Sequence, residues 1–197
     1  MNKQLKIGVT GCIGSGKSTV CKIFTQLGAP LYDADTRAKE LMISSPEIIQ
    51  GIKNLFGRDA YLADGSLNKK LISDKAFYQK DLLEQLNAIV HPAVFNDFIV
   101  WCDLYASKPY IIKEAALMFE SKSHTQVDQI IVVTAPEELR ISRTMNRDHL
   151  SKDDVLSRMS NQFSQEEKVS RADFEIKNDE NELLIPQVLK LHLLFLK

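Results

Sequence analysis

The sequence predicts an α/β fold in which a five-stranded parallel sheet lies between layers of helices. Two observations predict it. Short β-branched runs alternate with longer helix-like segments along the chain, and the run Ile130-Ile131-Val132-Val133 is apolar at consecutive positions. A continuous apolar strand is typical of a central strand covered on both faces, although the same run also fits one turn of a buried helix. With 197 residues, the chain can form one domain with a small insertion, but not two full enzyme domains.

Strands are expected in five places, at Leu5 to Thr10, Ala29 to Tyr32, Tyr110 to Lys113, Ile130 to Thr134 and Phe174 to Ile176. Helices are expected at Lys17 to Leu27, in several segments from Thr36 to Leu104, in pieces from Pro136 to Phe163, and from Glu182 to Leu196. The connection from Asp33 to Pro109 is far longer than a crossover of about a dozen residues. We therefore expect a single domain with a core of 1–33, 106–139 and 165–197, a helical substrate subdomain at about 34–105 and a helical lid at about 140–164.

Composition and charge exclude several functional classes. Lys and Arg number 25 against 26 Asp and Glu, so a net charge of -1 provides no general attraction to nucleic acid or to an anionic membrane. The sequence contains no apolar run of membrane-spanning length, and its N-terminal residues lead directly into a strand-like run. The three cysteines show no C-x-x-C spacing, which argues against a disulfide framework or a structural zinc site. We expect a cytoplasmic protein with neither a nucleic-acid nor a membrane partner.

The segment from Gly11 to Ser18 fits G-x-x-x-x-G-K-[ST] in full and connects a predicted strand to a predicted helix. Glycines let backbone N–H groups approach phosphate oxygens, and the helix N-terminus adds partial positive charge. Lys17 is expected to reach the β- and γ-phosphates of ATP, and the Ser18 hydroxyl to ligate Mg²⁺. The expected nucleotide-binding positions are Gly11, Gly14, Ser15, Gly16, Lys17, Ser18 and Thr19, the last at the α-phosphate. The dinucleotide-binding pattern G-x-G-x-x-G is not completed, because Thr19 stands where its last glycine is needed.

Asp33 follows the second predicted strand. Ligands of open parallel sheets bind beyond the carboxyl ends of the strands, so this carboxylate is expected to face the phosphate loop. It can accept a proton from an attacking hydroxyl, which we favour, or hold Mg²⁺ through water. Asp35 is a less certain partner, and both aspartates also fit a plain helix N-terminus.

Arg140, Arg143 and Arg147 are spaced three and four residues apart, so they share a face of a predicted helix. Arginines on such a face can close over ATP as a lid and stabilise the transferring phosphate, or they can form a solvated face paired with Glu137 and Glu138. The guanine-recognition motif N-K-x-D is absent, and no long apolar strand ends in a plain Walker B aspartate. A small-molecule kinase is the class favoured by these features.

The segments Val9 to Val20 and Asp33-Ala34-Asp35 together resemble dephospho-coenzyme A kinases. Similar segments follow in consistent order at Gly65 to Lys69, Leu86 to Pro92, Leu117 to Glu120, Arg143 to Asp148 and Arg158 to Gln162. The resemblance implies a P-loop kinase fold and transfer of the ATP γ-phosphate to the 3′-hydroxyl of dephospho-coenzyme A, giving coenzyme A and ADP. It also implies catalytic or phosphate-contacting roles for Thr10, Lys17, Asp33 and Arg143, with Arg147 as the alternative lid residue.

The chain departs from the family pattern at Cys12, Lys69 and Ala116, and in the absence of a glycine from Asn178-Asp179-Glu180, but at no phosphate-chemistry residue. Two other interpretations stay open. One is another small-molecule P-loop kinase, such as a nucleoside-monophosphate or shikimate kinase, and the other is a nucleotide-gated ATPase switch. His91 is either a substrate contact or a structural group, and Glu114 and Glu120 either line the substrate pocket or pair with lysines at the surface. We expect a monomer.

Overall fold

The computed structural model describes residues 4–197, apart from the side chains of residues 76–78 and 80. Residues 1–3, which the expected core segment 1–33 includes, lie outside the described residues. The chain divides into two compact units. The core unit runs up to Asp33 and resumes from Cys102 to Lys197, and the helical unit is Ala34–Trp101. In the described part of the chain, no helix combines the length and hydropathy needed to cross a bilayer.

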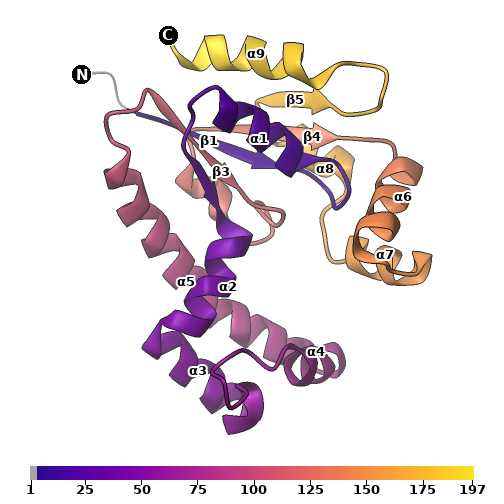
Figure 1. Ribbon diagram of the computed structural model, residues 1–197. Helices are drawn as coiled ribbons and strands as arrows, with labels where there is room; N and C mark the ends of the chain where they lie inside the picture. Colours follow the sequence, from indigo (N-terminus) through magenta and orange to yellow (C-terminus); the bar gives the residue numbers. More distant parts are fainter. Residues whose placement is uncertain (1–3) are drawn as a thin grey trace. The chain divides into compact units, whose positions relative to one another are not determined.

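The core unit contains one five-stranded sheet with the strand order β2-β3-β1-β4-β5 (Figure 1). The strands are β1 (Leu5–Thr10), β2 (Leu31–Asp33), β3 (Tyr110–Glu114), β4 (Gln129–Thr134) and β5 (Phe174–Lys177). Each neighbouring pair is parallel, so the predicted five-stranded parallel sheet is confirmed. Because β1 lies at the centre, the loop that follows it emerges between the carboxyl ends of β3 and β4.

The second strand was expected at Ala29 to Tyr32, and both of these bounds are wrong, because β2 is Leu31–Asp33. Pro30 has no N–H group, so it can only accept a ladder hydrogen bond, which Ile112 N–H donates over 2.8 Å. The regular ladder therefore begins one residue later. As a result, Asp33 is the last residue of the strand and stands opposite Glu114 of β3.

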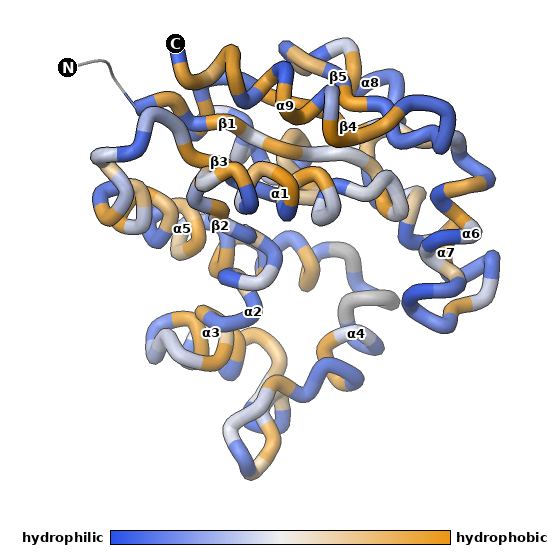
Figure 2. Tube along the Cα trace, turned by 45° about the horizontal axis from the view of Figure 1, so that its top comes forward, coloured by the Kyte–Doolittle hydropathy of each residue, from blue (hydrophilic) through white to orange (hydrophobic). Residues whose placement is uncertain are grey.

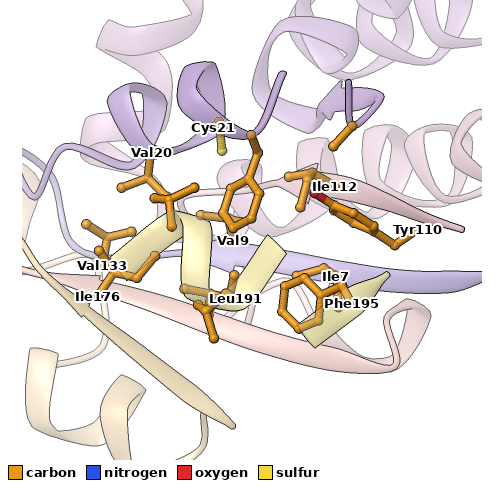
Figure 3. Close-up of a cluster of buried hydrophobic side chains, with 14 residues drawn as sticks. Ile7, Val9, Val20, Cys21, Tyr110, Ile112, Val133, Ile176, Leu191 and Phe195 are labelled. Atoms are coloured by element: carbon orange, nitrogen blue, oxygen red, sulfur yellow. The ribbon is translucent and has the colours of Figure 1, made fainter. Parts of the chain in front are cut away.

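The helices of the core unit are α1 (Lys17–Gln26), α6 (Glu137–Asp148), α7 (Lys152–Met159), α8 (Gln165–Ser170) and α9 (Leu184–Phe195), with a 3-10 turn η2 (Ser123–Gln126). Helices α1 and α9 pack together on one face of the sheet. Figure 3 shows Val9 beneath Cys21 of α1, and Ile7 beside Phe195 of α9. Alternate residues of β1 point into this apolar layer, which makes the sheet and its two helices one core.

The opposite face of the sheet is closed by α8 and by the segment after β3. Gly8 points to this side, where an added Cβ would lie 2.6 Å from the sulfur of Met118. Helix α8 contacts β4 there. In Figure 2, β4 is coloured as hydrophobic and α6 as largely hydrophilic. Both faces of β4 are thus covered, as its continuous apolar sequence predicted.

The helical unit contains α2 (Ala34–Ser44), α3 (Pro46–Phe56), a 3-10 turn η1 (Arg58–Ala60), α4 (Lys69–Tyr78) and most of α5 (Lys80–Leu104). Helix α3 buries Ile48, Ile52 and Phe56, which are spaced four residues apart and therefore lie on one face of the helix. Arg37 of α2 donates two hydrogen bonds to the Asp97 carboxylate of α5, at 3.0 and 2.6 Å. This bidentate pair fixes the register between the two helices.

Candidate active site

The phosphate loop connects β1 to α1 and depends on glycine at two positions in particular. Gly14 has φ +76°, and an added Cβ would lie 2.3 Å from the carbonyl oxygen of Arg140. Gly16 has φ +92°, and its Cβ would lie 2.1 Å from Nδ2 of Asn178. The positive φ favours glycine at both positions, and at Gly14 the Arg140 backbone also leaves no room for a side chain. No side chain caps the N-terminus of α1, and an uncapped helix N-terminus offers N–H groups to an anion.

Lys17 is the first residue of α1. Its Nζ donates to the carbonyl oxygens of Gly11 at 2.9 Å and Cys12 at 3.5 Å, so the ammonium group lies over the loop. The neighbouring Ser15 is turned inward. Its N–H donates to the Cys12 carbonyl, and its buried hydroxyl has no hydrogen-bond partner in the described part of the chain. The Lys17 ammonium group therefore lies beside the loop carbonyls, and its contact with phosphate stays a prediction.

Ser18 and Asp33 are joined through Glu114, which the sequence analysis left outside the catalytic set. The Ser18 hydroxyl donates to Glu114 Oε1 over 2.8 Å, and Asp33 pairs with Glu114 in the ladder between β2 and β3. Strand β3 lies between the strands that carry the phosphate loop and Asp33. Glu114 therefore does not pair with Lys113 at the surface. The signal that could have found it is its position at the carboxyl end of a buried strand beside β1.

The environment of Glu114 favours its protonated form. Glu114 is only 7% exposed, and this burial raises the pKa of its carboxyl, with a smaller contribution from the charge of Asp33. The Ser18 hydrogen bond and the positive charge of Lys17 oppose the shift without cancelling it. Burial and the nearby Glu114 also raise the pKa of the Cys21 thiol. A cation placed beside Glu114 would favour the charged carboxylate.

Thr10 lies at the end of β1 and is fully buried. Its hydroxyl is 3.5 Å from the carbonyl oxygen of Ala116, a long hydrogen bond to the segment after β3. The residue therefore lies next to Gly11 at the start of the phosphate loop. A role for Thr10 in catalysis or phosphate contact stays a prediction.

The three arginines of α6 have three different environments. Arg140 is 5% exposed and donates to the Ala135 carbonyl over 3.1 Å, so it is part of the core. The Arg143 side chain is 29% exposed, and it contacts the Asn178 carbonyl at 3.1 Å and Glu180 at 3.2 Å. The Arg147 side chain is 62% exposed and pairs with its neighbour Asp148 at 2.7 Å.

Asn178 explains why Arg143 is the arginine associated with the loop. Its side-chain amide donates to the carbonyl oxygen of Ser15 over 2.8 Å, while its own carbonyl accepts from Arg143. Asn178 follows β5, so its contact with the loop depends on the sheet topology rather than on a local motif. From sequence, this position stands out only as part of a departure from the family pattern.

Asp35 and His91 belong to the helical unit. Asp35 is exposed in the first turn of α2, where a carboxylate is favourable for the helix dipole. His91 lies within α5 before Pro92, and burial lowers the pKa of its imidazole. Neither position by itself indicates a catalytic role.

The oxygen donors of the site fit a magnesium ion. No group of three or more His, Cys, Asp or Glu residues arranged to hold a metal occurs within residues 4–197. Mg²⁺, however, is usually held by one or two carboxylates together with substrate phosphates and water. Ser18 and Glu114 offer a hydroxyl and a carboxylate oxygen 2.8 Å apart beside the phosphate loop. This donor set suits a small hard cation.

Comparison with known proteins gives one consistent result. The family model described as dephospho-CoA kinase matches residues 5–183. A dephospho-CoA kinase of Bacteroides fragilis strain YCH46 is 38% identical over 187 residues, covering 95% of this chain and 91% of that protein. The dephospho-CoA kinase of Chlorobaculum tepidum is 41% identical over 181 residues, covering 89% and 86%.

The fold shows the same relationship. A solved structure of the dephospho-CoA kinase from Campylobacter jejuni is similar to this chain with a TM-score of 0.71 and 26% identity, and the match covers 95% of each chain. The match therefore extends over nearly the whole length of both chains.

Proposed function

The chain belongs to the dephospho-CoA kinase family, and from this premise we propose how its residues transfer the γ-phosphate of ATP to the 3′-hydroxyl of dephospho-coenzyme A. The family reaction is ATP-dependent phosphorylation of dephospho-CoA, a step of coenzyme A biosynthesis. The observation that carries the assignment of roles is the convergence of Lys17, Ser18 and Asp33 around Glu114 at the carboxyl edge of the sheet.

Lys17 neutralises negative charge on the β- and γ-phosphates. Its ammonium group lies over the phosphate loop, where the loop carbonyls of Gly11 and Cys12 hold it. Backbone N–H groups of the loop and of the first turn of α1 bind the phosphates. Because these donors are fixed before the nucleotide arrives, they stabilise the transition state without reorganisation.

Asp33 orients the acceptor hydroxyl and accepts its proton. It ends β2 next to Glu114, which faces the loop through Ser18. The hydroxyl oxygen forms the new bond to phosphorus as the bond to the ADP oxygen breaks, and the proton moves to the Asp33 carboxylate. Thr10 supports the first residue of the loop, and Arg143 stabilises charge on the transferring group.

Ser18 and Glu114 are proposed to hold Mg²⁺, Ser18 directly and Glu114 directly or through water. When bound there, the ion would neutralise negative charge on the nucleotide phosphates. Helices α6 and α7 are proposed as the lid, and the helical unit as the part that binds the coenzyme A substrate. The three cysteines, Cys12, Cys21 and Cys102, are unpaired and buried, which supports a cytoplasmic location, and we propose a monomer.

The first experiment measures ADP release from MgATP with and without dephospho-CoA, with coenzyme A identified by mass. We expect ADP formation that depends on the acceptor and matches coenzyme A formation. Lys17→Ala should lower the rate by more than about a hundredfold, while Lys22→Ala, an exposed lysine of the same helix, should leave it unchanged. Turnover that does not depend on the acceptor would favour an ATPase switch instead.

A further inference from the structure

Helix α8 contains a fully buried lysine. Lys168 is 0% exposed, and its Nζ lies 2.9 Å from the Ala116 carbonyl oxygen and 2.9 Å from Glu120 Oε1. Burial of an ammonium group is costly unless an opposite charge and hydrogen bonds compensate for it. Glu120 provides that charge, so the pair is a defined feature of the core rather than a chance surface contact.

Glu120 also holds a segment that leads away from the proposed lid. Its Oε1 accepts a hydrogen bond from Phe163 N–H over 2.8 Å, and Oε2 is buried with no partner in the described part of the chain. The ring of Phe163 faces the Arg171 guanidinium at 5.0 Å, and this same guanidinium lies 5.8 Å from the Phe119 ring. Phe163 is thus fixed at both its backbone and its ring.

The Gln162-Phe163 segment contacts the phosphate loop directly. Gln162 Oε1 accepts from Ile13 N–H over 2.8 Å, and the Cys12 thiol lies 3.7 Å from the Phe163 carbonyl oxygen, which it can donate to. Ile13 precedes Gly14, where the chain turns to φ +76°. Because Ile13 N–H donates to a residue outside the loop, this hydrogen bond restricts the orientation of the peptide groups that follow Ile13.

We propose that Glu120 is a positioning residue for nucleotide binding. Anchored by Lys168, it fixes Phe163, and Gln162 then holds the phosphate loop in its binding conformation. Glu120 does not touch the nucleotide in this scheme. The proposal rests on the proposed function, because it assumes that the loop binds the phosphates of ATP. It also adds the segment that follows α7, which ends at Met159, to the nucleotide site.

The test compares Glu120→Gln, Gln162→Ala and the double variant by calorimetric titration with ADP. Each single change should weaken ADP binding five- to tenfold, and the double variant should bind no more weakly than the worse single variant, because the two residues act in series. The control is Glu166→Gln, the same substitution at an exposed position of α8, which should leave affinity unchanged. Thermal unfolding of each variant gives the effect on stability.

A purely structural role for Glu120 predicts a different pattern. Glu120→Gln would then lower the melting temperature but leave the ADP affinity of the folded protein within twofold of wild type, which would overturn the proposal. Additive losses in the double variant would also overturn it. If Glu120→Gln does not fold, Gln162→Ala decides alone, since an unchanged affinity there removes the link to the loop. Because ADP binding needs no acceptor, failure of the wild type to phosphorylate dephospho-CoA is a separate result.

Discussion

The Ser18 hydroxyl donates a hydrogen bond of 2.8 Å to the buried carboxylate of Glu114. This contact joins the first turn of α1 to the end of β3, and Glu114 in turn pairs in register with Asp33 at the end of β2. Three elements that are separate in the sequence therefore meet at the carboxyl ends of the strands.

Asp33→Asn is expected to lower kcat by about 10²–10⁴-fold while nucleotide affinity stays near wild type, because the amide keeps the shape but cannot accept the hydroxyl proton. Steady-state ADP release and ADP titration measure the two quantities. A switch protein would retain its partner binding after the same change.

The Mg²⁺ dependence separates the two roles considered for Asp33. If Asp33 is the base, a higher Mg²⁺ concentration does not restore the variant. If it holds the ion through water, the Mg²⁺ concentration for half-maximal rate rises and excess metal recovers activity. Asp35→Asn is the matched comparison, and its exposed position predicts a change of less than about threefold.

Arg143→Ala is expected to reduce kcat by about 10²–10³-fold, and Arg147→Ala by less than about threefold. The reason is their position, since Arg143 contacts Asn178, which is bound to the phosphate loop, whereas Arg147 pairs with Asp148 at the surface. Both variants are assayed at saturating ATP and acceptor. The reverse ranking would assign the lid function to Arg147.

Gly14→Ala is expected to raise the ADP dissociation constant at least about tenfold. A left-handed backbone conformation costs an L-residue about 1–2 kcal/mol, and at Gly14 the added Cβ would also meet the Arg140 carbonyl at 2.3 Å. Gly28→Ala is the control, because Gly28 has φ +90° with nothing within 4 Å of an added Cβ. It should lower stability by about 1–2 kcal/mol without changing ADP affinity. Equal affinities for both variants would contradict a requirement specific to the loop.

The sequence predicts the sheet well because β4 is apolar at consecutive positions, which is typical of a strand covered on both faces. The phosphate loop is equally predictable, since its chemistry is contained in eight consecutive residues. The start of β2 is not, because the missing N–H of Pro30 decides where the ladder begins only once β3 is its neighbour.

Glu114 and Asn178 show the limit for the site. Each follows or ends a strand, and each reaches the loop only because β3 and β5 take their positions in the order β2-β3-β1-β4-β5. Nothing local in Asn178-Asp179-Glu180 indicates a contact with Ser15, which is 163 positions away. Contacts of this kind follow from topology and register, and residue type alone does not predict them.

Glu114→Gln is expected to stabilise the protein at pH 8 and to lower its activity. Burial raises the folded-state pKa of Glu114 above the ordinary value of about 4.3, so the folded protein holds this proton more tightly than the unfolded chain does. Protonated Glu114 makes its full contribution to the free energy of unfolding at any pH below the pKa that the group has in the unfolded chain. This contribution is lost as the pH rises through the higher pKa that the group has in the folded protein. Glutamine keeps an oxygen for the Ser18 hydrogen bond but has no charge to bury.

The melting temperature of the Glu114→Gln variant should therefore exceed that of wild type at pH 8. The increase should be about 2–4 °C for each kcal/mol gained in the free energy of unfolding, and it should shrink toward pH 4. A variant that melts below wild type at pH 8 would mean that the charged carboxylate stabilises the fold, and that its partners Ser18 and Lys17 outweigh the cost of burial.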